Sequence, residues 1–218
     1  MPTLSPAELA RRLDLTLARP EATRRDLEAL CAAARGGDVH SVCVSSSRVE
    51  LARTLLESSE VKVTALVGFP LGTEDADAKR YETEVAVDQG AQEIETVLNI
   101  GRLKDGDRGY VLREWRDIAE AADERPVKVI LETGLLTPAE RTLACELALD
   151  SGVHCVCTGI RAPATVEDVR DLRAAVGDKF GVKAAGLSDL HTALALIEAG
   201  ATRLGAVEGV AGLPQPPR

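Results

Sequence analysis

Residues 84–101 read EVAVDQGAQEIETVLNIG and contain the repeating unit from which the fold is predicted. A helix over 75–89 is expected to end at Gln89, and the apolar segment 93–98 predicts a buried strand before a loop at 99–101. The same order of short apolar strand, loop and helix recurs along the chain. The expected strands are residues 13–17, 41–44, 61–67, 93–98, 127–131, 154–157, 181–183 and 203–205.

Each of these eight strands except the last is followed by a predicted helix. Capping-box patterns mark two helix starts, Ser5 with Glu8 and Thr137 with Glu140. Strands and helices that alternate in this way predict an α/β fold, a parallel sheet closed as a (β/α)8 TIM barrel. A doubly wound open sheet is the alternative. We expect one domain over residues 1–218, because aromatic residues are only 2% of the chain and small aliphatic residues suit helices packed on parallel strands.

Composition argues against several classes of function. The formal net charge of -9 disfavours binding to nucleic acid or to an anionic membrane, which requires clustered Lys and Arg. No apolar run approaches the ~18 residues of a membrane helix, and the N-terminus lacks the apolar segment of a secretory signal. The five cysteines are an odd number scattered through apolar segments, which is typical of reduced thiols. We therefore expect a cytoplasmic protein.

A metal site is not expected around the cysteines of the sixth strand. On a strand, Cys155 and Cys157 point to one face and His154 to the other, and the usual spacing of paired thiolates is absent. We expect neither a metal nor another cofactor.

Polar residues near the C-terminal ends of barrel strands meet at one mouth, so candidate site residues follow from the strand positions. These candidates are Asp14, Cys43, Glu95, Lys128, Glu132, Cys157, Lys183 and Glu208. Lys128 and Lys183 lie inside apolar strands, where a charge is costly unless it is paired or neutralised.

Two readings of these lysines stay open. If they face one another, each lowers the pKa of the other, and a neutral lysine attacks carbonyl carbons to form an imine. Alternatively, each lysine pairs with Glu95 or Glu132 in a buried ion pair that holds the barrel closed.

The other candidates also have two interpretations. Asp14, followed by Thr16, orients a substrate hydroxyl or simply holds the mouth of the first strand. Cys43 and Cys157 are nucleophiles only where a cation or a helix N-terminus activates them; otherwise they are packed as small hydrophobic residues.

Eight motifs occur in a fixed order along the chain. They are LDLTLARP at 13–20, SVCV at 41–44, VGFPLG at 67–72, EVAVDQGAQEIETVLNIG at 84–101, VKVILETGLLT at 127–137, TVEDVR at 165–170, GVKAAG at 181–186 and ALALIEAGATRLG at 193–205. In these motifs the chain resembles the deoxyribose-phosphate aldolase family over nearly its whole length. The resemblance implies a (β/α)8 barrel, often dimeric, that makes and breaks a carbon–carbon bond of a phosphorylated sugar through a lysine imine without metal.

The site departs from the family pattern. The family's sixth strand typically ends VKTSTGF with the imine-forming lysine, whereas VCTGI places Cys157 there, and a thiol cannot form an iminium ion. Glu95 in IETV replaces the aspartate of IDMV. The serines of the family's IGTSSG phosphate site are absent from LGAVEG, where Glu208 would repel a phosphate dianion. The loop after the sixth strand is shorter, and its Arg161 either supplies a compensating positive charge or is only a solvated side chain. Gly186 begins the altered loop of the seventh strand.

The hypothesis drawn from these departures is an enzyme repurposed for aldol, retro-aldol or related carbonyl chemistry on a small molecule without phosphate. The alternatives are a non-catalytic binding or regulatory barrel and an ordinary deoxyribose-phosphate aldolase. A homodimer is expected from the resemblance. The catalytic candidates are Lys183 as nucleophile, with Lys128, Glu95, Asp14 and Cys157. The substrate-binding candidates are Thr16, Cys43, Glu132, Thr158, Arg161, Gly186 and Glu208.

Overall fold

The computed structural model describes residues 4–211, apart from the side chains at 188, 190 and 207–211. Eight parallel strands form a closed barrel in chain order, and the last strand pairs with the first. The strands are β1 (Leu13–Leu17), β2 (Ser41–Ser45), β3 (Lys62–Val67), β4 (Glu93–Val97), β5 (Val127–Ile130), β6 (Cys155–Cys157), β7 (Gly181–Asp189) and β8 (Arg203–Ala211). This confirms the TIM barrel and excludes the open sheet.

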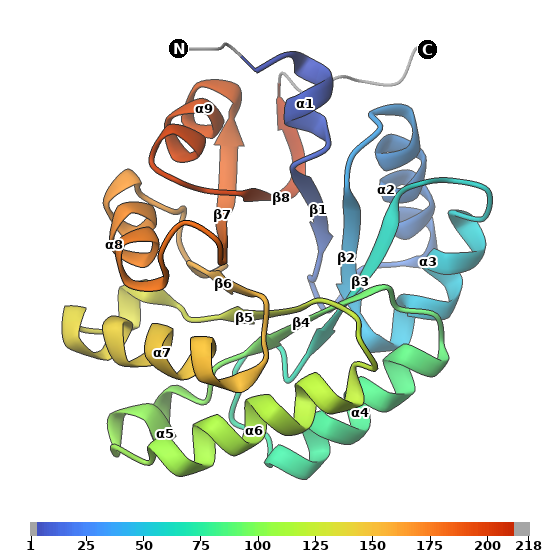
Figure 1. Ribbon diagram of the computed structural model, residues 1–218. Helices are drawn as coiled ribbons and strands as arrows, with labels where there is room; N and C mark the ends of the chain where they lie inside the picture. Colours follow the sequence, from blue (N-terminus) through green and yellow to red (C-terminus); the bar gives the residue numbers. More distant parts are fainter. Residues whose placement is uncertain (1–3, 212–218) are drawn as a thin grey trace.

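Helices surround the barrel (Figure 1). They are α1 (Pro6–Ala10), α2 (Arg24–Gly36), α3 (Val49–Leu55), α4 (Ala76–Asp88), α5 (Ile100–Lys104), α6 (Arg108–Ala121), α7 (Pro138–Ser151), α8 (Val166–Val176) and α9 (Leu190–Glu198), with 3-10 turns η1 (Ser46–Arg48) and η2 (Thr133–Leu135). Both predicted capping boxes form, at the starts of α1 and α7. None of the helices in the described part of the chain is long and apolar enough to cross a bilayer.

Three segments differ from the sequence-based expectation by more than one residue. The predicted loop at 99–101 instead begins α5, because the Asn99 side chain accepts a hydrogen bond from the Arg102 N–H and caps a short helix. Strands β7 and β8 are longer than predicted, since they pair with each other beyond Gly186 across a shift in register. Gly186 has a φ of 78°, and a side chain there would lie 2.7 Å from Pro163.

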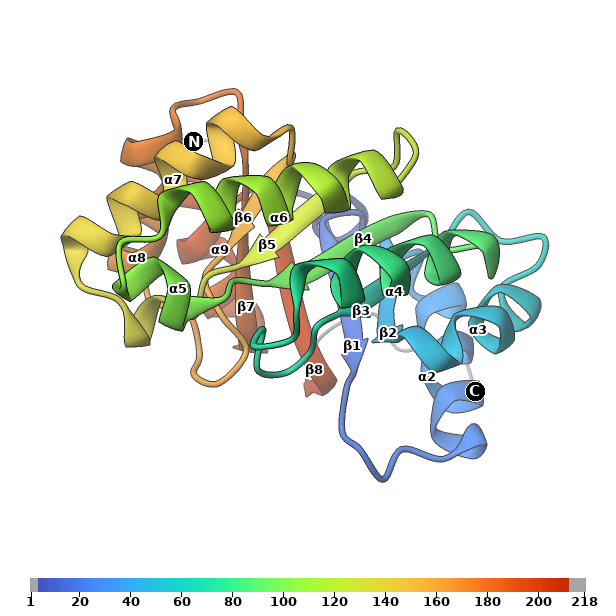
Figure 2. The ribbon, with the colours of Figure 1, turned by 90° about the horizontal axis from the view of Figure 1, so that it is seen from below.

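The main core lies between the sheet and the helices and consists mostly of Leu, Val, Ile and Ala. Viewed from below, α4 and α6 lie side by side over one part of the sheet (Figure 2). Trp115 of α6 is fully buried in this layer.

A buried ion pair also joins α4 to α6. Lys79 Nζ lies 2.9 Å from Glu114 Oε1 and donates a second hydrogen bond to the carbonyl oxygen of Val97, also at 2.9 Å. Neither charged side chain is exposed. Burial raises the pKa of Glu114 and outweighs the attraction of Lys79. The pair therefore fixes the two helices at a cost in desolvation.

Removing Lys79 should leave the Glu114 charge buried without its partner. We expect K79M to lower the free energy of unfolding by about 3–5 kcal/mol, and K79M/E114L to recover much of this loss. Chemical denaturation measures both. The matched control is R80M, whose pair with Glu84 on the surface of α4 is worth less than about 1 kcal/mol. A loss in K79M no larger than in R80M would contradict the assignment.

Candidate active site

The inside of the barrel holds a layer of charged side chains, which we call the barrel charge cluster. Its members are Asp14, Glu93, Glu95, Lys128, Lys183 and Arg203, and all except Arg203 are buried. They project from β1, β4, β5, β7 and β8. Because β-strand side chains alternate between faces, Glu93 and Glu95 both point inward from β4.

Lys183 is paired with carboxylates more closely than Lys128 is. Its Nζ lies 2.6 Å from Glu95 Oε2 and 2.9 Å from Asp14 Oδ2. Lys128 Nζ lies 2.6 Å from Glu93 Oε2 and 3.3 Å from the same oxygen of Asp14. Asp14 thus bridges the two ammonium groups across the barrel interior.

Arg203 completes the cluster from β8. Its NH1 lies 3.1 Å from Asp14 Oδ1. Burial would raise the pKa of Asp14, but Lys128, Lys183 and Arg203 together hold it well below its usual value. Asp14 is therefore an ionised carboxylate. Ser41 Oγ donates a further hydrogen bond to its Oδ1 at 2.8 Å.

The prediction that mutual repulsion leaves the two lysines with lowered pKa values is wrong. Burial disfavours the Lys183 ammonium and is the largest single effect, but Asp14 and Glu95 outweigh it and raise its pKa. The pKa of Lys128 is also raised: burial and repulsion from Lys183 lower it, and three carboxylates, including Glu93, outweigh both. The cluster holds both lysines charged, as in the ion-pair alternative.

An apolar layer separates the barrel charge cluster from the C-terminal ends of the strands. We call it the mouth layer. It consists of Cys43, Leu66, Val97, Ile130, Cys157 and Ala185, all buried. Ile130 and Ala185 lie two residues beyond Lys128 and Lys183 on the same faces of β5 and β7. The mouth layer therefore lies on the C-terminal side of the lysines.

The thiols of the mouth layer are protonated. Burial, with a smaller contribution from Glu95, raises the pKa of both Cys43 and Cys157 well above the usual value. Cys43 Sγ lies 3.6 Å from Glu95 Oε2 and donates to it. Cys157 pairs in register with Lys183 on the neighbouring strand. Thr16 of β1 is buried and pairs in register with Cys43.

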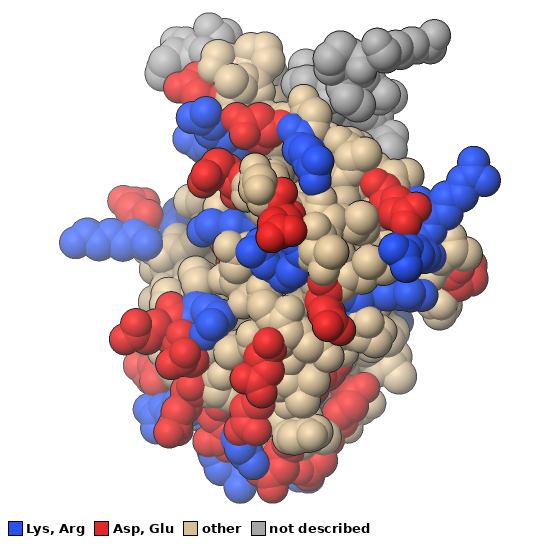
Figure 3. All heavy atoms as spheres, turned by 90° about the vertical axis from the view of Figure 1, so that its right-hand side faces the viewer, with Lys and Arg blue, Asp and Glu red and all other residues tan. Residues whose placement is uncertain are grey.

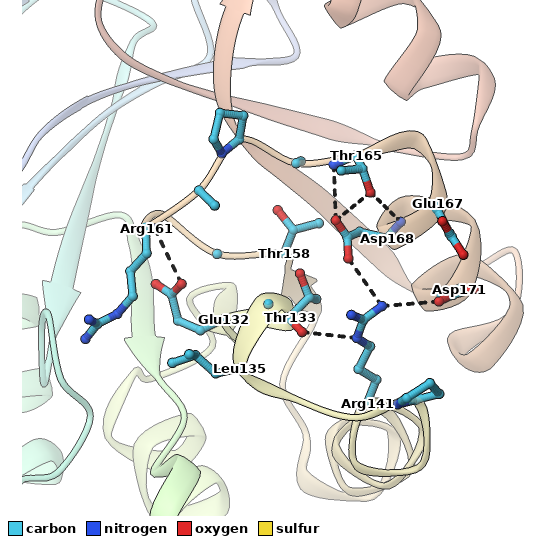
Figure 4. Close-up of a pocket in the computed structure, with 16 residues that line it drawn as sticks. Glu132, Thr133, Leu135, Arg141, Thr158, Arg161, Thr165, Glu167, Asp168 and Asp171 are labelled. Atoms are coloured by element: carbon cyan, nitrogen blue, oxygen red, sulfur yellow. Dashed lines mark hydrogen bonds and ion pairs between the residues drawn. The ribbon is translucent and has the colours of Figure 1, made fainter.

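Glu132 does not join the lysines, so the alternative in which it pairs with one of them is wrong. The residue has a φ of 55°, a left-handed conformation that directs the chain into η2. Its carboxylate accepts hydrogen bonds from the N–H groups of Ile160 at 3.1 Å and Arg161 at 3.4 Å. Figure 4 shows this carboxylate turned toward the loop after β6. Glu132 therefore fastens that loop.

A separate cavity of about 600 Å³ lies between the loops that follow β5 and β6. Glu132, Thr158 and Arg161 line it, together with Arg141 of α7 (Figure 4). Arg141 NH1 lies 3.3 Å from the carboxylates of both Asp168 and Asp171 of α8. The cavity contains neither lysine of the barrel interior.

The predicted site residues are thus divided between the barrel interior and the cavity beside the loops after β5 and β6. Thr158 lies between them, because it lines the cavity while its Oγ1 accepts a hydrogen bond from the N–H of Ala185 at 3.2 Å. Gly186 follows in β7 at the shift in register. Glu208 belongs to β8, but its side chain lies outside the described residues.

Sequence reasoning missed Glu93 and Arg203 as members of the barrel charge cluster. Both stand at the first position of their strands, away from the C-terminal ends where candidates were sought. The available signal was the spacing of Glu93 and Glu95, two residues apart on one face of β4. Within the described residues, no group of three or more His, Cys, Asp or Glu is arranged to hold a metal ion.

A family model for DeoC/LacD family aldolases matches residues 10–153, more than half of the sequence. The chain belongs to this family. It is 47% identical over 208 residues to a Bacillus licheniformis protein named deoxyribose-phosphate aldolase 1, with 93% of each chain covered. A deoxyribose-phosphate aldolase of Bdellovibrio bacteriovorus is 44% identical over 207 residues, covering 93% of this chain and 94% of that one.

A solved structure supports the same family fold. The deoxyribose phosphate aldolase from Aeropyrum pernix, described as tetrameric, superposes with a TM-score of 0.86 at 27% identity, covering 93% of this chain and 88% of that chain. The family-level resemblance drawn from the eight motifs is thereby confirmed.

The two thiols of the mouth layer should resist alkylation in the native protein. Iodoacetamide at about pH 8 should leave Cys43 and Cys157 unmodified, because the reactive species is the thiolate and burial keeps both thiols protonated. Peptide mapping by mass spectrometry measures the labelling, and the unfolded protein in concentrated guanidinium chloride is the control in which all five cysteines react. Rapid native labelling of Cys157 would restore it as a candidate nucleophile.

Proposed function

We propose that this family member catalyses an aldol or retro-aldol reaction, with deoxyribose 5-phosphate as the first substrate to test. The proposal rests on the 47% identity over 93% of both chains to a protein named as a deoxyribose-phosphate aldolase. Similarity of this extent favours the ordinary activity of the relatives over a repurposed reaction on a substrate without phosphate. Cys157 and Glu208 depart from the family pattern, and these departures concern which residue forms the imine and how the phosphate is bound.

Lys183 is the residue that we assign as the imine-forming nucleophile. Its partner in register on β6 is Cys157, the position at which the family resemblance places a lysine. Both side chains project from neighbouring strands into the barrel interior, so a nucleophile on β7 reaches the same part of the interior as one on β6. Lys128 lies on β5 and is held by Glu93 on the side away from the mouth layer.

Cleavage requires three events at these groups, after which the enamine left on Lys183 is protonated at carbon and hydrolysed by water to release the second product and the free lysine. Lys183 Nζ loses a proton and attacks the carbonyl carbon, and water leaves to give an iminium ion. The substrate's carbon–carbon bond then breaks, its electron pair passes toward the iminium nitrogen, and the hydroxyl of the departing aldehyde gives up its proton. Glu95, 2.6 Å from Lys183 Nζ, is the base placed to accept that proton, directly or through water.

The second candidate function is a non-catalytic barrel, and one observation favours it. Lys183 is only 1% exposed beneath the mouth layer, and its pKa is raised, so the structure holds the lysine charged and covered. An aldolase reaction therefore requires the mouth layer to open and the ammonium to lose a proton before a substrate reacts. A binding or regulatory barrel requires neither.

Reductive trapping distinguishes the two functions. Incubation with deoxyribose 5-phosphate, and separately with acetaldehyde, followed by borohydride should attach one reduced adduct to Lys183, because borohydride converts an imine into a stable amine. Intact mass and peptide mapping locate the adduct. K183M should abolish it, and K62M, which removes a partly exposed lysine at the start of β3, should retain it.

Absence of an adduct on Lys183 with both carbonyl compounds, in protein whose circular dichroism shows a folded barrel, would overturn the imine mechanism. Adducts confined to exposed lysines would also overturn the imine mechanism at Lys183. Either result would favour the non-catalytic barrel.

We also propose that residues 4–211 form one barrel domain, and that the protein works as a cytoplasmic homodimer on a small-molecule carbonyl compound without metal or other cofactor. Light scattering would distinguish the dimer from the tetramer described for the relative from Aeropyrum pernix. On the face shown in Figure 3, Lys and Arg side chains are interspersed with Asp and Glu, so the described part of that face presents no purely basic patch to a nucleic acid or an anionic membrane.

A further inference from the structure

The barrel charge cluster extends to the N-terminal ends of the strands, at the end of the barrel opposite the mouth layer. His40 precedes β2, and its Nε2 lies 2.7 Å from Glu93 Oε1. The other oxygen of Glu93 lies 2.6 Å from Lys128 Nζ. Asp14 Oδ2 then contacts both Lys128, at 3.3 Å, and Lys183, at 2.9 Å. A continuous path of polar contacts therefore connects His40 to Lys183.

The two ends of this path differ in their access to water. On the C-terminal side, the mouth layer covers Lys183, and its six members are all buried. On the N-terminal side, the His40 side chain is 20% exposed. The N-terminal end of the path is therefore in contact with solvent without any movement of the mouth layer.

Two other partly exposed cations approach Glu93, and neither is suited to carry a proton between Glu93 and water. Lys62 of β3 lies 3.7 Å from Glu93 Oε1, beyond hydrogen-bond distance. Arg203 of β8 lies 3.9 Å from the same oxygen, and a guanidinium group does not give up its proton in proteins. Histidine is the side chain that exchanges protons near neutral pH, and the imidazole of His40 contacts Glu93 directly.

We propose that His40 is a positioning residue that passes protons between the barrel charge cluster and solvent through the N-terminal end of the barrel. Lys128 donates a proton to the Glu93 carboxylate, which passes it on to Nε2 of neutral His40. The neutral Lys128 then regains a proton from Lys183 through the Asp14 carboxylate. The imidazolium ion then releases a proton to water, so the net change is the loss of one proton from Lys183.

For catalysis the inference rests on the proposed function, because only an imine-forming Lys183 needs to lose its proton. The proton path itself does not require an aldolase. Exchange of the lysine ammonium protons with water is a property of the folded protein and is measurable whether or not any carbonyl compound reacts.

The test compares H40Q with H154Q in protein carrying 15N at the lysine Nζ atoms. Glutamine preserves a hydrogen-bonding side chain but does not titrate. His154 is the matched control: it also precedes a strand, β6, but it is exposed and its Nδ1 accepts a hydrogen bond from the N–H of Val127. NMR measures the exchange of the Lys128 and Lys183 ammonium protons with water.

We expect exchange to be at least tenfold slower in H40Q and unchanged in H154Q. A merely structural role for His40 would have the opposite effect, since loosened packing accelerates exchange. In the wild type, the path should shut off as the pH falls through the range in which histidine becomes protonated, because a protonated imidazole accepts no proton. H40Q should lack this step.

Exchange in H40Q that stays within tenfold of the wild type, or an equal slowing in H154Q, would overturn the proposal. The wild-type pH profile alone would overturn it if it showed no step in the histidine range. Slower exchange in H40Q together with no borohydride adduct on Lys183 would support the proton path and refute the aldolase function, so the two failures are distinguishable.

Discussion

Three carboxylates and three basic side chains share the interior of this barrel, and each depends on the others for its charge. An unpaired ionised group in such a place costs several kcal/mol, because water is replaced by a medium of low polarity. Asp14 offsets this cost for Lys128, Lys183 and Arg203 at once, through contacts of 2.9–3.3 Å. The same contacts tie β1 to β5, β7 and β8 across the barrel.

This arrangement explains why a lysine on an inner strand is not automatically a neutral nucleophile. The mutual repulsion of Lys128 and Lys183 is real, but it is smaller than the combined attraction of the carboxylates around them. Chemistry at Lys183 must therefore include a step that removes charge from the cluster. The covering mouth layer makes the route of that proton as important as the identity of the nucleophile.

Much of the fold was predictable from local patterns, because strands and helices alternate with clear stops and the capping boxes at Ser5 and Thr137 are local in sequence. The inward direction of Lys128 and Lys183 was also predictable from the cost of a charge among apolar neighbours. The sign of their pKa change was not, since it depends on how many carboxylates converge from distant strands. The separation of Glu132 from both lysines escaped prediction for a different reason: its backbone is left-handed, and its carboxylate binds N–H groups of the loop after β6.

The neutrality of the barrel charge cluster has a consequence for how such sequences diverge. A lineage that replaced Lys183 alone would leave a surplus carboxylate sealed beneath the mouth layer, and a lineage that lost Asp14 alone would leave surplus cations. Either change is penalised until an opposite charge is lost as well. Positions on β1, β4, β5, β7 and β8 are therefore expected to vary as linked sets, whereas Cys157, whose side chain lies in the mouth layer and carries no charge there, is free to vary alone among uncharged residues.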